Sequence, residues 1–205
     1  MQREIGPITN EELVNAICSQ SRPLIKSKRD VALRSLANDI HAKNLGEVMV
    51  EAMGCAQWIR ADLELLLRAA FWLTLSVDEL RNRIVLDQKD LMQKFQKRLG
   101  LRDGEIESLL TRHDELLKSL PSINKRVENN AQILEHAVWH KAKLAKLYGH
   151  FHGRLSKLSH PDPFFLFFPE ALGNQIPEFL LPDFSLCASE LDKEWRELEE
   201  ETKAS

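Results

Sequence analysis

Apolar residues recur every three or four positions along most of the chain, and this spacing predicts helices. No segment shows the strict apolar–polar alternation of a half-buried strand, and no internal repeat is present. The fold class is therefore predicted to be all-α. The expected helices cover residues 11–20, 23–40, 47–75, 77–98, 103–119 and 185–201, and residues 131–158 form one helix or two with an interruption.

Helix-end signals support several of these boundaries. Thr9 and Asn10 precede two glutamates, as expected for an N-cap followed by first-turn acids. Ser76 with Glu79 three residues later forms a capping box for the helix that follows. Pro161 ends the helix before it, because the residue preceding a proline avoids the helical region.

The segment 47–75 is apolar on most of its surface, which is typical of a helix in the middle of a bundle. Among its few polar residues, Arg60 and Glu64 lie one turn apart and face the same way. A buried guanidinium needs an acceptor. Two interpretations are open: an internal salt bridge that ties helices together, or a charged pair that lines a cleft.

Residues 161–182 hold five of the eight prolines and the apolar run Phe164–Phe168. This composition predicts an irregular, extended segment that wraps over the core, covers a groove or meets a partner. The run itself fits a core lid or dimer cover, and also a platform on which nucleic-acid bases stack. The helix after it carries an apolar stripe of Leu191, Trp195 and Leu198.

Composition and charge narrow the class of protein. The 205 residues carry a net charge of −3 with both signs interspersed, which is no footprint for a large nucleic-acid surface. The three cysteines are far apart, so reduced thiols are expected rather than a disulfide framework or zinc site. There is no secretory leader and no apolar run long enough to span a bilayer. A soluble, cytoplasmic protein without membrane contact is expected.

The domain organisation follows the same pattern. Residues 1–30 are predicted to form an N-terminal helical extension, 31–163 a helical bundle, and 164–205 a Pro/Phe-rich wrap with a C-terminal amphipathic helix. With 205 residues, these parts are expected to make one compact domain overall.

The stretch Leu144–Pro163 is the richest in groups that could do chemistry. Its apolar positions predict a face for the core, and small residues at Gly149 and Gly153 predict a second face that another helix approaches closely. Ser156 and His160 continue that second stripe. His160 also fits a helix-end histidine that caps carbonyl groups.

Arg154 and His160 together suggest phosphate chemistry. Arginine holds a phosphate by bidentate contact, and histidine moves a proton at neutral pH. A metal-independent ribonuclease needs a base, a cation and an acid. Six residues along a helix correspond to about 240° of rotation, so the pair shares a face only if the helix ends before His160 or a second subunit completes the site.

Metal and cofactor signals are weak. His136 and His140 have the i, i+4 spacing of two ligands on one helix face, but no H-E-x-x-H or Glu-x-x-His motif accompanies them. No phosphate-binding loop, dinucleotide fingerprint or esterase motif is present. We therefore predict neither a metal nor a cofactor.

The two helical motifs resemble the HEPN superfamily of helical domains. The resemblance covers roughly 32–163 and is carried by R-x-x-x-E at Arg60 and Glu64, and by a later helix with Tyr148 that ends in S-x-x-x-H-P at Ser156 and His160. It implies an antiparallel helical bundle that often dimerises through the motif helices.

The resemblance also implies a function. Many HEPN proteins are metal-independent ribonucleases of toxin–antitoxin or anti-phage systems, with an arginine four to six residues before a histidine, as Arg154 stands to His160. By this resemblance His160, Arg154, Arg60 and Glu64 are the predicted catalytic residues. Ser156, Tyr148 and His152 are the predicted substrate-binding residues.

The implied partners are a second copy of the chain, RNA and an antitoxin or other protein. Leu155 stands where the family usually has a polar residue next to the arginine. A non-enzymatic module that binds nucleotides or proteins is therefore the alternative.

Overall fold

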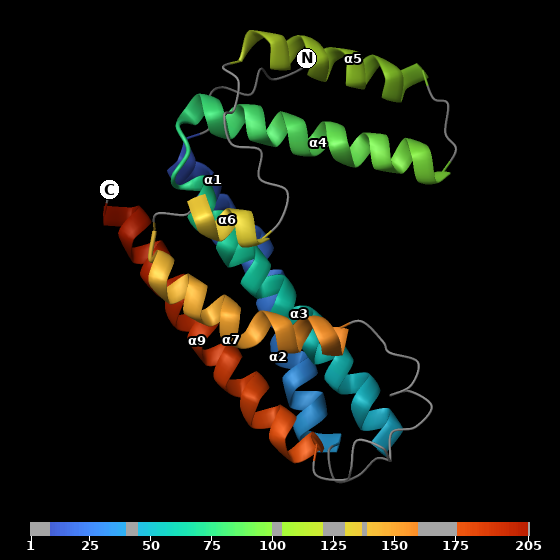
Figure 1. Ribbon diagram of the computed structural model, residues 1–205, viewed down its shortest axis with the longest axis vertical. Coiled ribbons are helices and arrows are strands. Elements are labelled where there is room, and N and C mark those ends of the chain that lie inside the picture. The colour runs from blue at the N-terminus through green and yellow to red at the C-terminus, as the bar shows by residue number, and fades with distance from the viewer. Residues whose placement is uncertain are drawn as a thin grey trace.

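The computed structural model describes residues 9–39, 45–99, 104–120, 130–136, 139–159 and 176–204. The described residues form helices and connecting turns, without a strand, which confirms the all-α prediction. The helices are α1 Asn10–Ala16, the π-helical η1 Ile17–Ser21, α2 Arg22–Asp39, α3 Leu45–Trp72, α4 Val77–Leu99, α5 Gly104–Ser119, α6 Asn130–His136, α7 Lys141–Ser159 and α9 Ile176–Ala204 (Figure 1).

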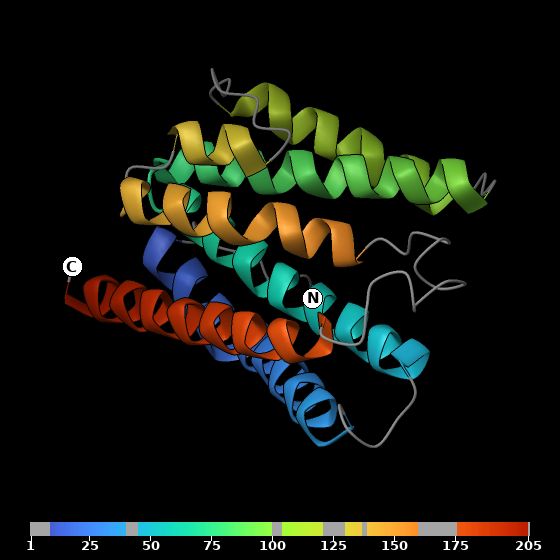
Figure 2. The same cartoon turned by 60° about the horizontal axis from the view of Figure 1, so that its bottom comes forward.

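The long helix α3 is the centre of the fold. It packs against α2, α7 and α9, which lie around it in both views (Figures 1 and 2). Its inward residues Ile59, Leu63, Leu66 and Leu67 are fully buried, as its apolar sequence predicted. Burial of side chains of this size contributes roughly 1.5–3 kcal/mol each, so α3 holds much of the core together.

The N-terminal helices form a continuous helical segment across the predicted break near Pro23. Thr9 caps α1 through a reciprocal capping box with Glu12. The chain then passes through the π-turn Ile17–Ser21 into α2, whose second residue is Pro23, which has no N–H to donate to the preceding turn. One helical path therefore joins the predicted extension to the predicted bundle.

Helices α4 and α5 form a hairpin that lies across one end of α3 (Figure 1). The predicted capping box begins α4, because the backbone N–H of Ser76 donates to the Glu79 carboxylate and the backbone N–H of Glu79 donates to the Ser76 hydroxyl. Across the hairpin, Lys89 pairs with Asp114. The sequence therefore placed this end of α4 correctly.

The C-terminal helix begins earlier than predicted. The expected start was residue 185, but α9 runs from Ile176 and includes Pro182 in its interior. Pro177 lies in the first turn, where a proline is tolerated, and Phe184 and the leucines before it pack on the core. Apolar packing thus outweighs the helix-breaking effect of Pro182, and the prediction that residues 176–182 are extended was wrong.

The predicted apolar stripes are confirmed. Leu191, Trp195 and Leu198 are fully buried on α9, and Leu144 and Phe151 are buried on α7. The run Phe164–Phe168 lies outside the described residues.

Candidate functional site

A polar cluster lies where α3 meets α7, and it contains four of the predicted site residues. On α3, Arg60 Nε donates to Glu64 Oε1 over 2.8 Å. On α7, the rings of Tyr148 and His152 stack with their centroids 4.2 Å apart. His152 Nε2 lies 3.9 Å from Glu64 Oε1, which joins the two pairs. The helical spacing of four residues within each pair explains why each pair shares one face.

The cluster is half-buried rather than sealed in the core. The side chains of Arg60, Glu64 and His152 are 26%, 27% and 20% exposed. Arg60 and Glu64 therefore fit neither interpretation from the sequence fully. Their hydrogen bond lies within one helix, so by itself it does not tie two helices together. The pair also faces the neighbouring helix α7. A half-exposed arginine next to a histidine is able to meet a small anionic group from solvent.

The electrostatics of the cluster favour a neutral His152. Burial lowers the pKa of His152 below its usual value, the charge of Arg60 lowers it further, and the charge of Glu64 opposes both. Nε2 is shielded from solvent and has no hydrogen-bond partner. Burial and the charge of Glu64 raise the pKa of Tyr148. A neutral imidazole with an unused nitrogen is the form that acts as a general base.

The structure does not describe the side chains of the other three predicted site residues. Arg154 and Ser156 belong to α7, C-terminal to His152, but their side chains lie outside the described part of the structure. His160 lies outside the described residues altogether. The predicted pairing of Arg154 with His160 therefore stays a prediction.

The glycine stripe does not mark a helix–helix contact within the described chain. A Cβ atom built on Gly149 or Gly153 would meet no atom within 4 Å, and both residues are exposed. The expectation that another helix approaches closely there is wrong for the part of this chain that the structure describes. The apolar face of α7, rather than its small residues, makes the contact with α3.

A second polar cluster, which the sequence did not reveal, ties α2, α3 and α9 together. Arg29 is 1% exposed and donates to Asp62 Oδ2 over 2.6 Å and to Asp192 Oδ2 over 2.9 Å. The indole N–H of Trp195 donates to Asp62 Oδ1 over 2.9 Å. Asp62 stood out as a polar residue in an apolar helix, but nothing in the sequence linked it to Arg29 or Trp195.

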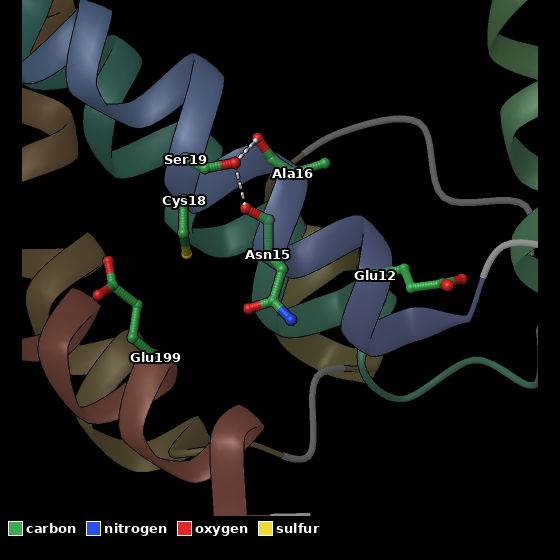
Figure 3. A pocket seen from close by; sticks show the side chains of 6 residues that line it. All are labelled: Glu12, Asn15, Ala16, Cys18, Ser19 and Glu199. Atoms are coloured by element: carbon green, nitrogen blue, oxygen red, sulfur yellow. Dashed lines mark hydrogen bonds between the residues drawn. The ribbon is translucent and has the colours of Figure 1, made fainter.

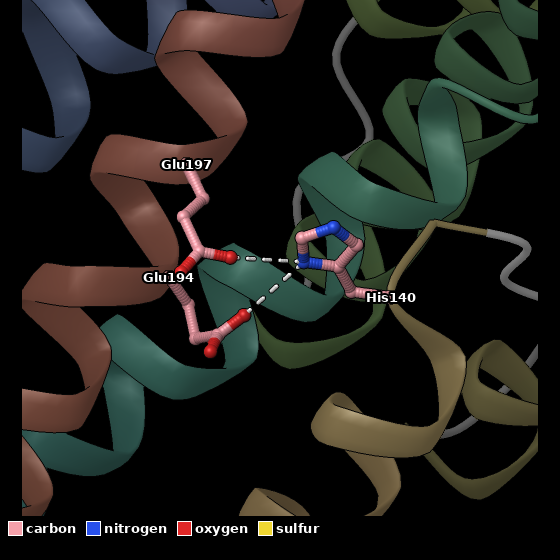
Figure 4. A group of neighbouring side chains, drawn as sticks. All are labelled: His140, Glu194 and Glu197. Atoms are coloured by element: carbon pink, nitrogen blue, oxygen red, sulfur yellow. Dashed lines mark hydrogen bonds and ion pairs between the residues drawn. The ribbon is translucent and has the colours of Figure 1, made fainter.

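A third group of polar side chains lies where the turn before α7 meets α9 (Figure 4). His140 Nδ1 lies 3.5 Å from Glu194 Oε2 and 3.3 Å from Glu197 Oε2. The i, i+4 spacing of His136 and His140 does not put them on one helix face, because α6 ends at His136 and His140 lies in the turn before α7, with a φ of 43°. The two glutamates are i, i+3 on α9, but only the fold brings them to the histidine.

An open pocket of about 530 Å³ lies between the N-terminal helices and α9 (Figure 3). Its lining includes Glu12, Asn15, Cys18 and Glu199. It shares no residue with the α3–α7 cluster or with the predicted site. Glu199 is paired with Arg22, and the Glu12 carboxylate accepts a hydrogen bond from the backbone N–H of Thr9. We base no function on this pocket.

Comparisons of the chain with protein-family models, with curated proteins and with solved structures found no match. Among the described residues, no helix is both long and apolar enough to cross a membrane.

Proposed function

We propose that this protein is a HEPN-like, metal-independent endoribonuclease that uses the α3–α7 cluster. The observation that carries the proposal is that His152 Nε2 is shielded and has no hydrogen-bond partner, beside the partly exposed pair of Arg60 and Glu64. Burial and the charge of Arg60 lower the pKa of His152. Helix α7 also carries Arg154 and leads to His160. Proton transfer and phosphate binding, the two needs of RNA cleavage without a metal, are therefore supported by one helix and its neighbour.

The chemistry assigns a role to each residue. A base removes the proton of the ribose 2′-hydroxyl, the resulting oxygen bonds to phosphorus, and an acid protonates the departing 5′-oxygen. His160 acts as general acid/base together with His152, and Arg154 or Arg60 holds the phosphate. Glu64 and Ser156 orient these groups. The stacked rings of Tyr148 and His152 offer a surface for a base.

The test is RNA cleavage by the purified chain in EDTA. Wild type should release fragments with 2′,3′-cyclic phosphate and 5′-hydroxyl ends. His160→Ala and Arg60→Ala should each reduce the rate by about 10²–10⁴-fold, the usual contribution of an acid–base or charge-stabilising group. His152→Ala changes the histidine of the described cluster and should also reduce the cleavage rate.

His150→Ala is the matched control, because His150 lies on the same helix but is exposed. It should cleave at the wild-type rate. No cleavage of any RNA by folded wild type, or equal cleavage by all variants, would disprove the ribonuclease.

A non-enzymatic binding module is the second candidate, and a specific observation favours it. His152 Nε2 is enclosed, and Arg60 is already ion-paired with Glu64. A substrate would have to displace these contacts to reach either group. In this case the cluster is structural, and His152→Ala lowers stability by about 1–3 kcal/mol through loss of buried contacts while partner binding persists.

The partners belong to the same proposal. RNA is the substrate, a second copy of the chain completes the site, and an antitoxin or other protein controls it in toxin–antitoxin or anti-phage defence. Light scattering of the purified chain measures the mass in solution. A strictly monomeric mass at assay concentration, together with full activity, would remove the second copy from the mechanism.

A further inference from the structure

We propose that His140, Glu194 and Glu197 bind a divalent metal ion of the Zn²⁺ class, which fastens the turn before α7 to α9. This site lies outside the α3–α7 cluster and shares no residue with it, so it does not depend on the proposed ribonuclease. Its donor atoms all lie within 4.8 Å of one another. Imidazole nitrogen with carboxylate oxygen is a common donor set for zinc.

The distances fit a tetrahedral ion. With metal–ligand bonds of about 2.0–2.1 Å, two ligand atoms of a tetrahedral site lie about 3.4 Å apart. His140 Nδ1 lies 3.5 Å from Glu194 Oε2 and 3.3 Å from Glu197 Oε2. Both glutamate side chains point toward the histidine nitrogen from one face of α9 (Figure 4). An ion between them therefore needs small side-chain rotations only, and water supplies the fourth ligand.

The buried carboxylate of Glu194 points independently to a cation. Its side chain is only 6% exposed, and its described contacts are a long hydrogen bond of 3.5 Å with His140 Nδ1 and an ion pair of 3.9 Å with Lys143 Nζ. Both are longer than an ordinary hydrogen bond of about 2.7–3.2 Å. A carboxylate that is removed from water is costly unless a charge of opposite sign compensates it. The metal ion supplies that charge at the point toward which Glu194 is aimed.

The second ring nitrogen of His140 has the neighbour that zinc-binding histidines usually have. Nε2 lies 3.0 Å from Glu201 Oε1. A carboxylate at this place favours the tautomer with the proton on Nε2, so that the lone pair of Nδ1 faces the metal. Glu201 also accepts from the indole N–H of Trp139, whose ring stacks on that of His140. The ring is thus held in the orientation that the site requires.

The surroundings of His140 are rich in carboxylates. Glu194, Glu197 and Glu201 lie around its ring, and Lys143 is an ammonium group that pairs with two of them. Lys143 Nζ lies 2.7 Å from Glu197 Oε2 and is half exposed, so it competes with the metal for this oxygen and is free to turn into solvent. A divalent ion adds positive charge among these carboxylates.

The experiment is zinc titration of the untagged, chelator-treated full chain, followed by calorimetry and by thermal unfolding. A Cys18→Ser background removes the half-exposed thiol that could bind zinc by itself. We expect one zinc per chain and a higher unfolding temperature with zinc. Glu194→Gln and Glu197→Gln should abolish saturable binding, and Glu201→Gln should weaken it by about 10-fold or more.

Two further variants separate a metal site from an ordinary ion-pair network. Glu200→Gln, at an exposed residue of the same helix, should bind zinc like wild type. Lys143→Ala should bind zinc more tightly, because a competing cation is removed, whereas a network without metal would only lose stability. Co²⁺ should give the visible absorption of a four-coordinate site, and this absorption should vanish in Glu194→Gln.

Either of two results would overturn the proposed metal site. One is no saturable zinc binding by folded wild type, and the other is zinc binding that is unchanged in Glu194→Gln and Glu197→Gln. Such a result would mean that His140 Nδ1 contacts Glu194 and Glu197 directly. Because circular dichroism of the zinc-free chain reports whether each variant is folded, loss of binding by unfolding is recognised separately.

Discussion

Helix α3 carries two polar clusters that differ in how completely their groups are satisfied. Asp62 lies in the core with Arg29 and Trp195, and its carboxylate accepts hydrogen bonds of 2.6 Å and 2.9 Å from them. Arg60 and Glu64, two residues away on either side, face α7 at the edge of the core. There His152 Nε2 is shielded from solvent and has no hydrogen-bond partner. One apolar helix thus contributes to a buried cluster in which Asp62 is hydrogen-bonded, and to a partly exposed cluster in which a histidine nitrogen is not.

The difference shows what a polar residue in an apolar helix indicates. A buried charge is tolerated when its partners and hydrogen bonds are complete, and breaking it is then costly. A half-exposed pair within one helix contributes little to stability, so its presence needs another explanation. Completeness of hydrogen bonding, rather than the presence of charge, therefore marks the α3–α7 cluster as the candidate site.

The largest expected effect comes from Asp62→Ala. It leaves the buried Arg29 without one of its carboxylates and the Trp195 N–H without an acceptor, so the free energy of unfolding should fall by about 3–5 kcal/mol. Urea unfolding measures the change. Glu64→Ala on the same helix is the matched comparison and should cost only about 0.3–0.5 kcal/mol, as for an exposed i, i+4 pair.

If Asp62→Ala does not fold, Asp62→Asn keeps an acceptor for Trp195 and should fall between the two variants. Equal losses for Asp62→Ala and Glu64→Ala would remove the distinction between the clusters.

A change of pH should have an effect of intermediate size on stability, through the protonation of His152. Because its pKa is lower in the folded protein than its usual value of 6.5, the unfolded chain takes up the proton first as the pH falls. The contribution of neutral His152 is therefore complete above about pH 6.5 and is lost as the pH falls below it. Wild type should lose more stability than His152→Gln between pH 7.5 and pH 5.5.

Urea unfolding of both proteins at the two pH values gives this difference directly. The exposed His150→Gln should behave as wild type. A difference of the opposite sign would mean that Glu64, rather than burial and Arg60, dominates the environment of His152.

The smallest effect is expected at the glycines on the outer face of α7. Gly149→Ala and Gly153→Ala should each stabilise the chain by about 0.5–1 kcal/mol, because alanine is the better helix former and the added Cβ meets no atom. Thermal or urea unfolding measures the gain. A loss that deepens with protein concentration would instead show that a second copy packs on this face, as the small-residue stripe predicted.

Local signals in the sequence carried much of the fold. The N-cap at Thr9, the capping box at Ser76 and the buried stripe around Trp195 appear where they were expected, because caps and helical periodicity depend on residues within a few positions. The start of α9 was missed, because the packing of Phe184 against distant helices outweighs the local preference of Pro182. The interruption between α6 and α7 lies within a segment for which the sequence left one helix or two open.

For the candidate site, the sequence indicated which residues are neighbours on one helix, and only the fold determined which helices meet. Spacing alone placed Arg60 beside Glu64 and Tyr148 beside His152, because residues four apart on a helix are neighbours. That the two pairs meet, that Asp62 instead reaches Arg29 and Trp195, and that His140 meets Glu194 were all decided by the packing of α3, α7 and α9. These contacts join positions 33 to 133 residues apart, and no local rule fixes such a distance before the helices pack.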